Sequence, residues 1–361
     1  MFTKDTSFRI GCGRYLQRRG ALKSCAEEIL RLGRAPRIIA GKTAWTVAGA
    51  AIEKSLSEAN IPCDPQIYKG TCNADAAKEF AEKARADGSG MIVGVGGGVI
   101  MDFSKLVAAL AGLPIINIPT STATCAAFTP LSVCYTEDGR TLGTVHHKTE
   151  VNAVIADPEI LICQPPRLLL AGVFDAMAKF LEIKHRYCPA DTSYSLGLDY
   201  AYVMAARSYE ELSRKTADCL EAIQKGEVNE AFEQIVYTLI AATGAISGIA
   251  RGSNQTALGH KFYEITRALY PAESKSYLHG ELVGVGLLLQ NEYNGERERN
   301  AELLAFMKKY GLPHSPESAG VPKEALPAFY DSIMKSSAMH DTAPEEAEKL
   351  HQSLEYLWRY A

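Results

Sequence analysis

The chain has 361 residues, of which 47% are hydrophobic and 22% are charged, and its formal net charge is −4. This composition is typical of a folded globular protein and excludes an intrinsically disordered chain. The small negative charge provides no basic field for nucleic acid or anionic lipid, so we expect neither nucleic acid nor membrane as a partner. A chain of this length has room for two domains, each with its own hydrophobic core.

The cysteines indicate neither a disulfide framework nor a thiolate metal site. There are nine of them, an odd number, scattered along the chain without a CxxC pair. We expect most to be small buried side chains in a reducing compartment. The first residues lack the long apolar segment of a signal peptide, and no apolar run approaches the roughly 20 residues of a membrane helix. The sequence therefore predicts a cytoplasmic protein.

The N-terminal part of the chain alternates short apolar, β-branched runs with helical patterns. Strands are predicted at residues 36–40, 65–69, 91–95 and 113–118, and helices at 44–59, 75–87 and 99–112. This alternation predicts a parallel sheet covered by helices on both faces.

Beyond Pro165 the pattern becomes helical almost throughout. Helices are predicted at residues 167–187, 194–214, 228–250, 278–293, 297–310, 323–336 and 343–360. Two consecutive prolines, Pro165 and Pro166, punctuate the change. We therefore predict an α/β nucleotide domain at residues 1–163, an all-helical domain at residues 164–361, and an active site in the cleft between them.

A glycine-rich turn, Gly94-Val95-Gly96-Gly97-Gly98, follows the strand at 91–95 and precedes a helix. Glycines let the backbone approach a phosphate closely, and the free N–H groups of a helix start favour an anion. Asp102 and Lys105 lie on the first turns of this helix. A tight strand–helix turn also uses glycine for steric reasons alone, and the segment is not the GxGxxG fingerprint of dinucleotide-binding proteins.

A second segment, residues 119–125, follows the strand at 113–118 with a run of small hydroxyl residues, PTSTATC. Its hydroxyl groups have the donors and acceptors needed to line a ribose or nicotinamide pocket. A plain loop that caps a helix is the other interpretation.

Three residues far apart in sequence have the chemistry of a metal site: Asp175, His260 and His279. One carboxylate and two imidazoles hold a divalent metal while leaving a coordination position open. Each also has an ordinary explanation. Asp175 lies in an apolar helical segment and needs a partner, which is a cation side chain or a metal. A single histidine in such surroundings is more often a hydrogen-bonded core residue than a ligand.

Five segments together resemble the iron-containing (group III) alcohol dehydrogenases, and within them the glycerol dehydrogenase branch. They are GVGGGVIMDFSK at 94–105, PTSTATCAAFTPLSVCY at 119–135, GVFDAMAKFLE at 172–182, ALGHKF at 257–262 and LHGE at 278–281. The resemblance extends from Pro36 to the last predicted helix. It implies a dehydroquinate synthase-like fold, with an α/β N-terminal Rossmann-like domain and an all-α C-terminal domain.

The resemblance also implies roles for particular residues. The metal ligands of the family fall on Asp175, His260 and His279, and we expect His260 beside the substrate as well. The implied metal is zinc, with iron as the alternative, and the implied hydride carrier is NAD(P). The family's nucleotide contacts fall on Gly98, Val99, Thr120, Ala123, Thr129, Leu131 and Tyr135. The glycine turn adds Gly96, Gly97 and Asp102 to the predicted cofactor site.

The chain departs from glycerol dehydrogenases at the end of its first strand. These enzymes usually carry an aspartate there for the adenosine ribose, whereas this chain has Gly41 and Lys42. Loss of the carboxylate removes repulsion toward a 2′-phosphate, and a lysine attracts one. We therefore include Gly41 and Lys42 in the cofactor site and expect NADPH to be accepted. A solvated surface lysine is the alternative.

The second departure is Cys125, which replaces an aspartate that binds the polyol in glycerol dehydrogenases. The segment ATCAAFTPLSV is similar instead to hydroxycarboxylate dehydrogenases of the same branch, which reduce 2-oxo acids. A pocket without this carboxylate suits an anionic substrate, and we expect Cys125 to line it. Arg251, Asn254 and Lys261 are candidates to meet the substrate carboxylate.

The predicted activity is hydride transfer between a nicotinamide cofactor and a small alcohol or carbonyl, with a 2-hydroxy acid/2-oxo acid pair as substrate. The alternatives are a glycerol dehydrogenase, a glycerol-1-phosphate dehydrogenase, a lyase like dehydroquinate synthase, and a nucleotide-binding regulator without catalysis. We expect a homo-oligomer.

Overall fold

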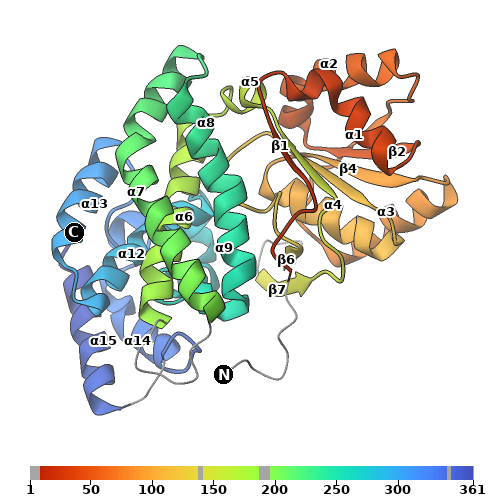
Figure 1. Cartoon of the computed structure of the whole chain (residues 1–361). Coiled ribbons are helices and arrows are strands. Elements are labelled where there is room, and N and C mark those ends of the chain that lie inside the picture. Colours follow the sequence, from red (N-terminus) through yellow and green to blue (C-terminus); the bar gives the residue numbers. More distant parts are fainter. Residues whose placement is uncertain (1–8, 137–140, 187–195, 340–342, 361) are drawn as a thin grey trace. The chain divides into compact units, whose positions relative to one another are not determined.

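The computed structural model of the chain describes residues 9–136, 141–186, 196–339 and 343–360 (Figure 1). By packing, the chain divides into two compact units, each made from separate stretches of sequence. One comprises residues 9–169 and 211–245, and the other contains residues 170–210 and 246–361. The predicted domain boundary between residues 163 and 164 stays a prediction, since this division is discontinuous along the chain.

The first unit contains a six-stranded, all-parallel sheet with the strand order β1-β8-β5-β4-β2-β3. Its strands are β1 (Tyr15–Gln17), β2 (Pro36–Ala40), β3 (Pro65–Ile67), β4 (Met91–Gly96), β5 (Ile115–Pro119) and β8 (Ala153–Ala156). The prediction of a parallel sheet is confirmed. The predicted strands correspond to β2, β3, β4 and β5, whereas β1 and β8 were not predicted.

Helices cover both faces of this sheet. They include α1 (Cys25–Leu32), α2 (Lys42–Glu58), α3 (Ala74–Ala86), α4 (Gly98–Ala111) and the short α5 (Pro158–Leu161). A further helix of this unit, α8 (Glu230–Tyr237), meets the edge strand β1, where Gln17 Nε2 donates to Glu233 O at 2.7 Å. Alternate strand residues, such as Val93 and Val95 of β4, form one core with α1 and α2. On the other face α4 comes so close that a Cβ at Gly94 would lie 2.7 Å from Ser104 Oγ. Successive residues of β4 therefore face opposite sides of the sheet, and both sides are buried under helices.

A hairpin of β6 (Leu131–Tyr135) and β7 (Thr141–His146) stands apart from the main sheet as a two-stranded antiparallel pair. The sequence analysis did not predict it. All six residues of β7 are exposed, so this strand lacks the buried apolar alternation that makes a strand recognisable.

The second unit is helical. Its main helices are α6 (Pro166–Arg186), α7 (Leu196–Lys225), α9 (Thr243–Ala250), α10 (Leu258–Leu269), α11 (Pro271–Ser274), α12 (His279–Asn294), α13 (Glu298–Lys309), α14 (Leu326–Met334) and α15 (Pro344–Leu357). Residues 187, 194 and 195 of the predicted helices lie outside the described residues. The first four residues of α6, the second half of α7 and the start of α9 belong to the other unit.

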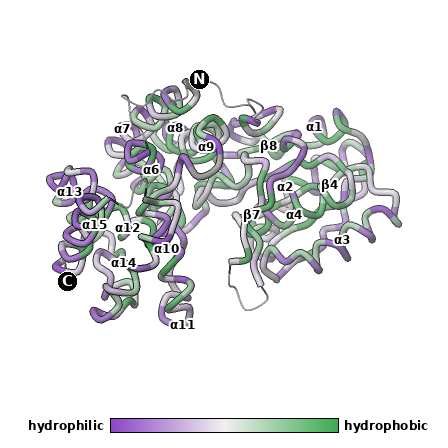
Figure 2. The backbone as a smooth tube through the Cα atoms, turned by 90° about the horizontal axis from the view of Figure 1, so that it is seen from below, coloured by the Kyte–Doolittle hydropathy of each residue, from purple (hydrophilic) through white to green (hydrophobic). Residues whose placement is uncertain are grey.

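The helix α12 forms the centre of this unit. All but two of its sixteen residues are buried, and the neighbouring α10 and α15 pack against it. By contrast, α13 carries many hydrophilic residues along its length (Figure 2). A helix buried almost all round is a scaffold on which side chains of neighbouring helices can be fixed.

One described helical run, residues 230–250, is long and apolar enough to cross a membrane by length and composition alone. It consists of α8, a π-helical turn (Thr238–Ala242) and α9. In its most apolar window of 18 residues, 61% of the window is buried inside the protein. This burial is typical of a core helix in a globular protein.

Candidate metal centre and dinucleotide site

The helical unit brings together the three predicted metal ligands. Asp175 comes from α6, His260 from α10 and His279 from α12. Asp175 Oδ1 lies 3.3 Å from His260 Nε2 and 3.3 Å from His279 Nε2. One potential ligand atom from each residue lies within 4.8 Å of the other two. Asp175 and His260 are buried, whereas 31% of the His279 side chain is exposed, which opens the cluster to solvent.

Glu182, which the sequence analysis did not assign, holds His260 in place. It lies two helical turns after Asp175 on α6, and its side chain is completely buried. Glu182 Oε2 lies 2.5 Å from Nδ1 of His260. Glu182 Oε1 accepts hydrogen bonds from the backbone N–H groups of Ala257 and His260, at 2.7 and 2.8 Å. One carboxylate therefore both caps the start of α10 and orients the imidazole.

The charges of this cluster support one another. Burial alone would lower the pKa of His260, but Glu182 and Asp175 outweigh burial and raise this pKa to about 9. Burial likewise acts to raise the pKa of Asp175, yet the Lys179 ammonium and the two histidines hold it well below its usual range. The pKa of Glu182 is also lowered, because the charge of His260, together with hydrogen bonds from His260 and Ala257, outweighs burial. Both carboxylates are thus kept ionised inside the protein.

Close backbone packing positions His279, the first residue of α12. A Cβ at Gly280 would lie 1.8 Å from the carbonyl oxygen of Ala171, so only glycine lets α12 start this close to α6. The carboxylate of Glu281 accepts a hydrogen bond from the Leu278 N–H at 2.8 Å and caps the helix. The ring of Tyr263 meets the His279 ring edge to face, with centroids 4.2 Å apart. The HGE sequence therefore has a structural reason at every position.

The donor set fits a divalent transition metal. Two imidazole nitrogens and a carboxylate oxygen point at one another, and a short Nδ1–carboxylate contact fixes which nitrogen of His260 is left to bind. An N–H at Nδ1 donates to Glu182, so Nε2 is the nitrogen that faces Asp175 and that would coordinate a metal on loss of its proton. A simple ion pair of Asp175 would need only one histidine, whereas here two histidines face the same carboxylate oxygen. The ligand roles of the three residues remain a proposal.

The α/β unit brings the predicted dinucleotide residues to one edge of its sheet. Gly41 follows β2, Gly97 follows β4 and Thr120 follows β5. The Gly41 N–H donates to Val95 O at 3.1 Å, and the Thr120 N–H donates to Gly96 O at 2.9 Å. From β2 the chain continues to β3 on one side, whereas from β4 it continues to β5 on the other. Dinucleotides bind in the crevice at such a switch point, outside the carboxyl ends of the strands.

The glycine turn and the hydroxyl-rich loop lie against each other at this edge. A Cβ at Gly97 would lie 3.2 Å from Ser121 Oγ, and one at Gly98 would lie 3.0 Å from Thr124 Oγ1. Gly97 is the N-cap of α4, which starts at Gly98. The first N–H groups of this fourteen-residue helix are therefore available to an anion such as a pyrophosphate.

Lys105 joins α4 to the remaining predicted cofactor residues. Its side chain is buried, and its Nζ donates to the carbonyl oxygens of Ala126 at 2.6 Å, Thr129 at 2.9 Å and Leu131. It also forms an ion pair of 2.9 Å with Asp102, whose other carboxylate oxygen accepts from the Val133 N–H. Sequence reasoning noted Lys105 only by its position, and a lysine at the end of a GGGxxxDxxK segment is the signal that was available.

The other predicted cofactor and substrate residues are placed as follows. Lys42 is exposed at the first position of α2, and Val99 is exposed on the first turn of α4. Thr129 and Cys125 are buried, while the remaining members are partly exposed: Thr120, Ala123, Leu131 and Tyr135. Asp102 is buried and engaged by Lys105, so its contact with a cofactor stays a prediction.

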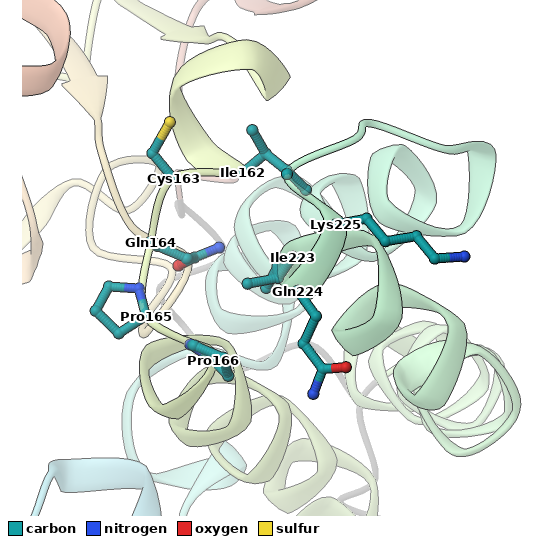
Figure 3. Close-up of a pocket in the computed structure, with 9 residues that line it drawn as sticks. Ile162, Cys163, Gln164, Pro165, Pro166, Ile223, Gln224 and Lys225 are labelled. Carbon is teal, nitrogen blue, oxygen red and sulfur yellow. The ribbon is translucent and has the colours of Figure 1, made fainter.

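A separate hollow of about 480 Å³ in the same unit contains none of the predicted site residues. Residues 162–166 and 223–226 line it (Figure 3). The Lys225 side chain points away from the 163–166 segment and pairs with Glu221. Gln164 turns instead to the hydroxyl-rich loop, where its Oε1 accepts from the Thr122 N–H at 2.8 Å. Gln164 thus holds the hydroxyl-rich loop in place, and the residues that line the hollow do not form a cluster of catalytic groups.

Comparisons with known proteins agree with this geometry. Residues 12–158 match the family described as "Iron-containing alcohol dehydrogenase". The chain is 30% identical to a glycerol dehydrogenase from Pseudomonas putida, covering 83% of this chain and 82% of that protein. It is 29% identical to hydroxycarboxylate dehydrogenase A from Escherichia coli, covering 68% and 67% of the two proteins.

Solved structures share the fold. The crystal structure of glycerol dehydrogenase from Schizosaccharomyces pombe superimposes with a TM-score of 0.84 at 23% identity, covering 99% of this chain and 91% of that one. The predicted fold class, a parallel α/β domain joined to a helical region in the dehydroquinate synthase-like arrangement, is confirmed. The chain belongs to the iron-containing alcohol dehydrogenase family, in its glycerol dehydrogenase-like branch, and is a dehydrogenase.

Proposed function

We propose that this dehydrogenase transfers hydride between NAD(P) and a small 2-hydroxy acid/2-oxo acid pair, with Asp175, His260 and His279 as ligands of a divalent metal. The observation that carries the proposal is the convergence of three ligand atoms within 4.8 Å, with Glu182 fixing the His260 ring. A metal held there acts as a Lewis acid on the substrate oxygen.

The residues of the chain have clear tasks in this scheme. The short contact between Glu182 and Nδ1 of His260 fixes the ring so that Nε2 faces Asp175, where a bound metal would take the place of the Nε2 proton. Asp175 stays ionised at neutral pH, as its lowered pKa requires. The glycine turn and the start of α4 bind the pyrophosphate, and the 120–135 segment held by Lys105 lines the nicotinamide end of the cofactor.

The substrate class rests on Cys125. Its side chain is buried and offers a thiol where a polyol site would have a carboxylate with two acceptor oxygens. The likeness to a protein named hydroxycarboxylate dehydrogenase A points in the same direction. Glycerol with dihydroxyacetone is the second candidate, because several relatives are named glycerol dehydrogenase.

For the metal, the glycerol dehydrogenase likeness favours zinc, whereas the name of the family favours iron. An Asp-His-His site accepts both ions. Elemental analysis of protein purified without added metal decides between them. The proposed homo-oligomer is tested by light scattering of the eluted protein.

A spectrophotometric screen at the nicotinamide absorbance tests the function. It pairs NADH and NADPH with 2-oxo acids, dihydroxyacetone, dihydroxyacetone phosphate and simple aldehydes. We expect the highest kcat/KM with a 2-oxo acid. A preference for dihydroxyacetone assigns the chain to glycerol oxidation, and a preference for its phosphate assigns it to glycerol-1-phosphate oxidation. Absence of net NAD(P)H consumption with every carbonyl contradicts the proposal and leaves the lyase or the regulator.

A further inference from the structure

Lys179 is a buried cation beside the metal cluster. It lies on α6, one turn after Asp175 and one turn before Glu182, so the three side chains occupy the same face of the helix. Only 5% of Lys179 is exposed. Its Nζ atom keeps some contact with solvent, and an ammonium in surroundings this enclosed gains from an anionic partner.

In the part of the chain that the structure describes, the Lys179 ammonium makes no hydrogen bond and no ion pair. Three other cations of the same unit are engaged by protein groups. Lys184 pairs with Glu296 at 2.5 Å, Arg186 donates to the carbonyl oxygen of Thr256, and Lys261 pairs with Glu264. Lys261 therefore has a carboxylate of its own and is poorly placed to serve the substrate, as is Asn254, which donates to Ala250 O.

The ammonium is close enough to act on the cluster electrostatically. Among the groups that lower the pKa of Asp175, Lys179 has the largest effect after the opposing effect of burial. It also acts against protonation of His260. It is nevertheless too far from Asp175 to form an ion pair within 4.0 Å. The positive charge of Lys179 therefore lies near the three proposed ligands without forming an ion pair with any of them.

The charge balance favours an anionic ligand. Asp175 and Glu182 contribute two negative charges, and Lys179 contributes one positive charge. A divalent metal on neutral histidines would leave the cluster with a net charge of one positive. A polyol carries no charge to match this, whereas a 2-oxo acid carries one carboxylate on the carbon next to its carbonyl.

We propose that the Lys179 ammonium binds the substrate carboxylate of a 2-oxo or 2-hydroxy acid whose adjacent oxygen faces Asp175, His260 and His279. This inference rests on the proposed function and makes Lys179 the residue that selects an acid over a neutral carbonyl. The exposed edge of His279 is the side from which such a ligand reaches the cluster.

The test compares Lys179→Met with Lys184→Met, a control on the same helix whose lysine pairs with Glu296. Each metal-loaded protein is assayed with pyruvate and with hydroxyacetone, a neutral carbonyl of the same size. Binding of oxamate, an unreactive carboxylate, is measured by calorimetry in the presence of the reduced cofactor. Metal per chain is measured in parallel.

We expect Lys179→Met to weaken oxamate binding and to lower kcat/KM for pyruvate by about 10- to 100-fold, the range of one charge-assisted hydrogen bond. The lower kcat/KM for pyruvate should come from a higher KM. The kcat/KM for hydroxyacetone should change by less than about threefold, and the metal content should be retained. Lys179→Arg, which keeps the charge, should recover part of the oxamate affinity. Lys184→Met should behave as the wild type.

Two results overturn the role of Lys179 while leaving the proposed function intact. In the first, the wild type is active on pyruvate and the Lys179→Met variant binds oxamate equally well. In the second, Lys179→Met loses pyruvate and hydroxyacetone activity to the same extent. Loss of the metal in Lys179→Met also overturns it, since removing a positive charge should leave metal binding unchanged or stronger. A wild type that reduces hydroxyacetone but neither reduces 2-oxo acids nor binds oxamate refutes the proposed substrate class as well.

Discussion

Glu182 contacts His260 twice, through Oε2 at 2.5 Å from the ring Nδ1 and through Oε1 at 2.8 Å from the backbone N–H. The carboxylate fixes both the rotation of the imidazole and the start of the helix that carries it. We predict that Glu182→Gln weakens metal binding by about 10- to 100-fold, because the amide is a poorer acceptor and does not favour a proton at Nδ1. Metal affinity is measured by competition with a chromophoric chelator.

Glu302→Gln, on the exposed side of α13, is the matched control and should bind metal as the wild type does. Glu182→Gln keeps the shape of the side chain, so the fold is expected to persist. Unchanged metal affinity in this variant would contradict the orienting role of Glu182.

Removal of the metal should abolish turnover. Dialysis against a chelator is expected to eliminate activity, and zinc or ferrous iron added separately should restore it for the ion that the protein uses. Asp175→Asn changes a proposed metal ligand directly. Its loss of metal affinity should therefore exceed the roughly 10- to 100-fold expected for Glu182→Gln, which changes a residue that only orients a ligand. His351→Asn, a partly exposed histidine of α15, serves as the control. Full activity of metal-stripped Asp175→Asn would disprove the metal centre.

Lys105 should stabilise the segment that contains Thr129 and Leu131. Lys105→Met leaves three carbonyl groups without their donor and Asp102 without its cation, so we expect a loss of about 3 to 5 kcal/mol in the free energy of unfolding. Urea denaturation measures this. Combining Lys105→Met with Asp102→Asn should recover part of the loss. Lys78→Met, an exposed lysine of α3, should change stability by less than about 0.5 kcal/mol. Equal effects of Lys105→Met and Lys78→Met would refute the bracing role.

His147 should make the protein sensitive to acid. Burial, with Lys105 and His146 adding to it, lowers the pKa of His147 from 6.5 to about 4, and its Nε2 lies 2.8 Å from Ser132 Oγ. The neutral form is therefore favoured in the folded state. The contribution of neutral His147 to stability is complete above pH 6.5 and is lost as the pH falls toward 4. At pH 5 the loss is about 2 kcal/mol.

Urea denaturation at pH 7.5 and pH 5 checks this contribution. His147→Asn should lose less stability between the two pH values than the wild type does. His351→Asn, on α15, is the control and should keep the wild-type difference. An identical pH dependence in wild type and His147→Asn would show that His147 is not the titrating group.

Lys42 should affect the choice between the two nicotinamide cofactors. It is exposed at the first position of α2, which begins just after the carboxyl end of β2. Lys42→Ala should raise KM for NADPH on the order of tenfold and leave KM for NADH unchanged, since only NADPH carries a 2′-phosphate. Lys54→Ala, further along α2, is the control. Equal or better kcat/KM of the wild type with NADH, unchanged by Lys42→Ala, would contradict the hypothesis.

Much of the fold could be predicted from local patterns. Apolar, β-branched runs gave β2, β4 and β5 nearly to the residue, because strands buried on both faces are continuous in sequence. The glycine turn was assigned to the N-terminus of α4, where Gly97 and Gly98 meet the hydroxyl-rich loop. The hairpin of β6 and β7 was missed because its outer strand is exposed on both faces.

The sequence by itself determined which residue types were available: an aspartate and two histidines, a glycine turn before a helix, and a cysteine in place of a carboxylate. Only the tertiary structure decided that Asp175, His260 and His279 converge and that Glu182 orients one of them, because α6, α10 and α12 meet through glycine contacts far apart in sequence. It also decided that Lys179 has no hydrogen-bond or ion-pair partner among the described residues and that residues 211–245 belong to the same unit as the sheet. Local periodicity specifies which face of a helix is apolar, whereas the neighbour on that face depends on the packing of the whole chain.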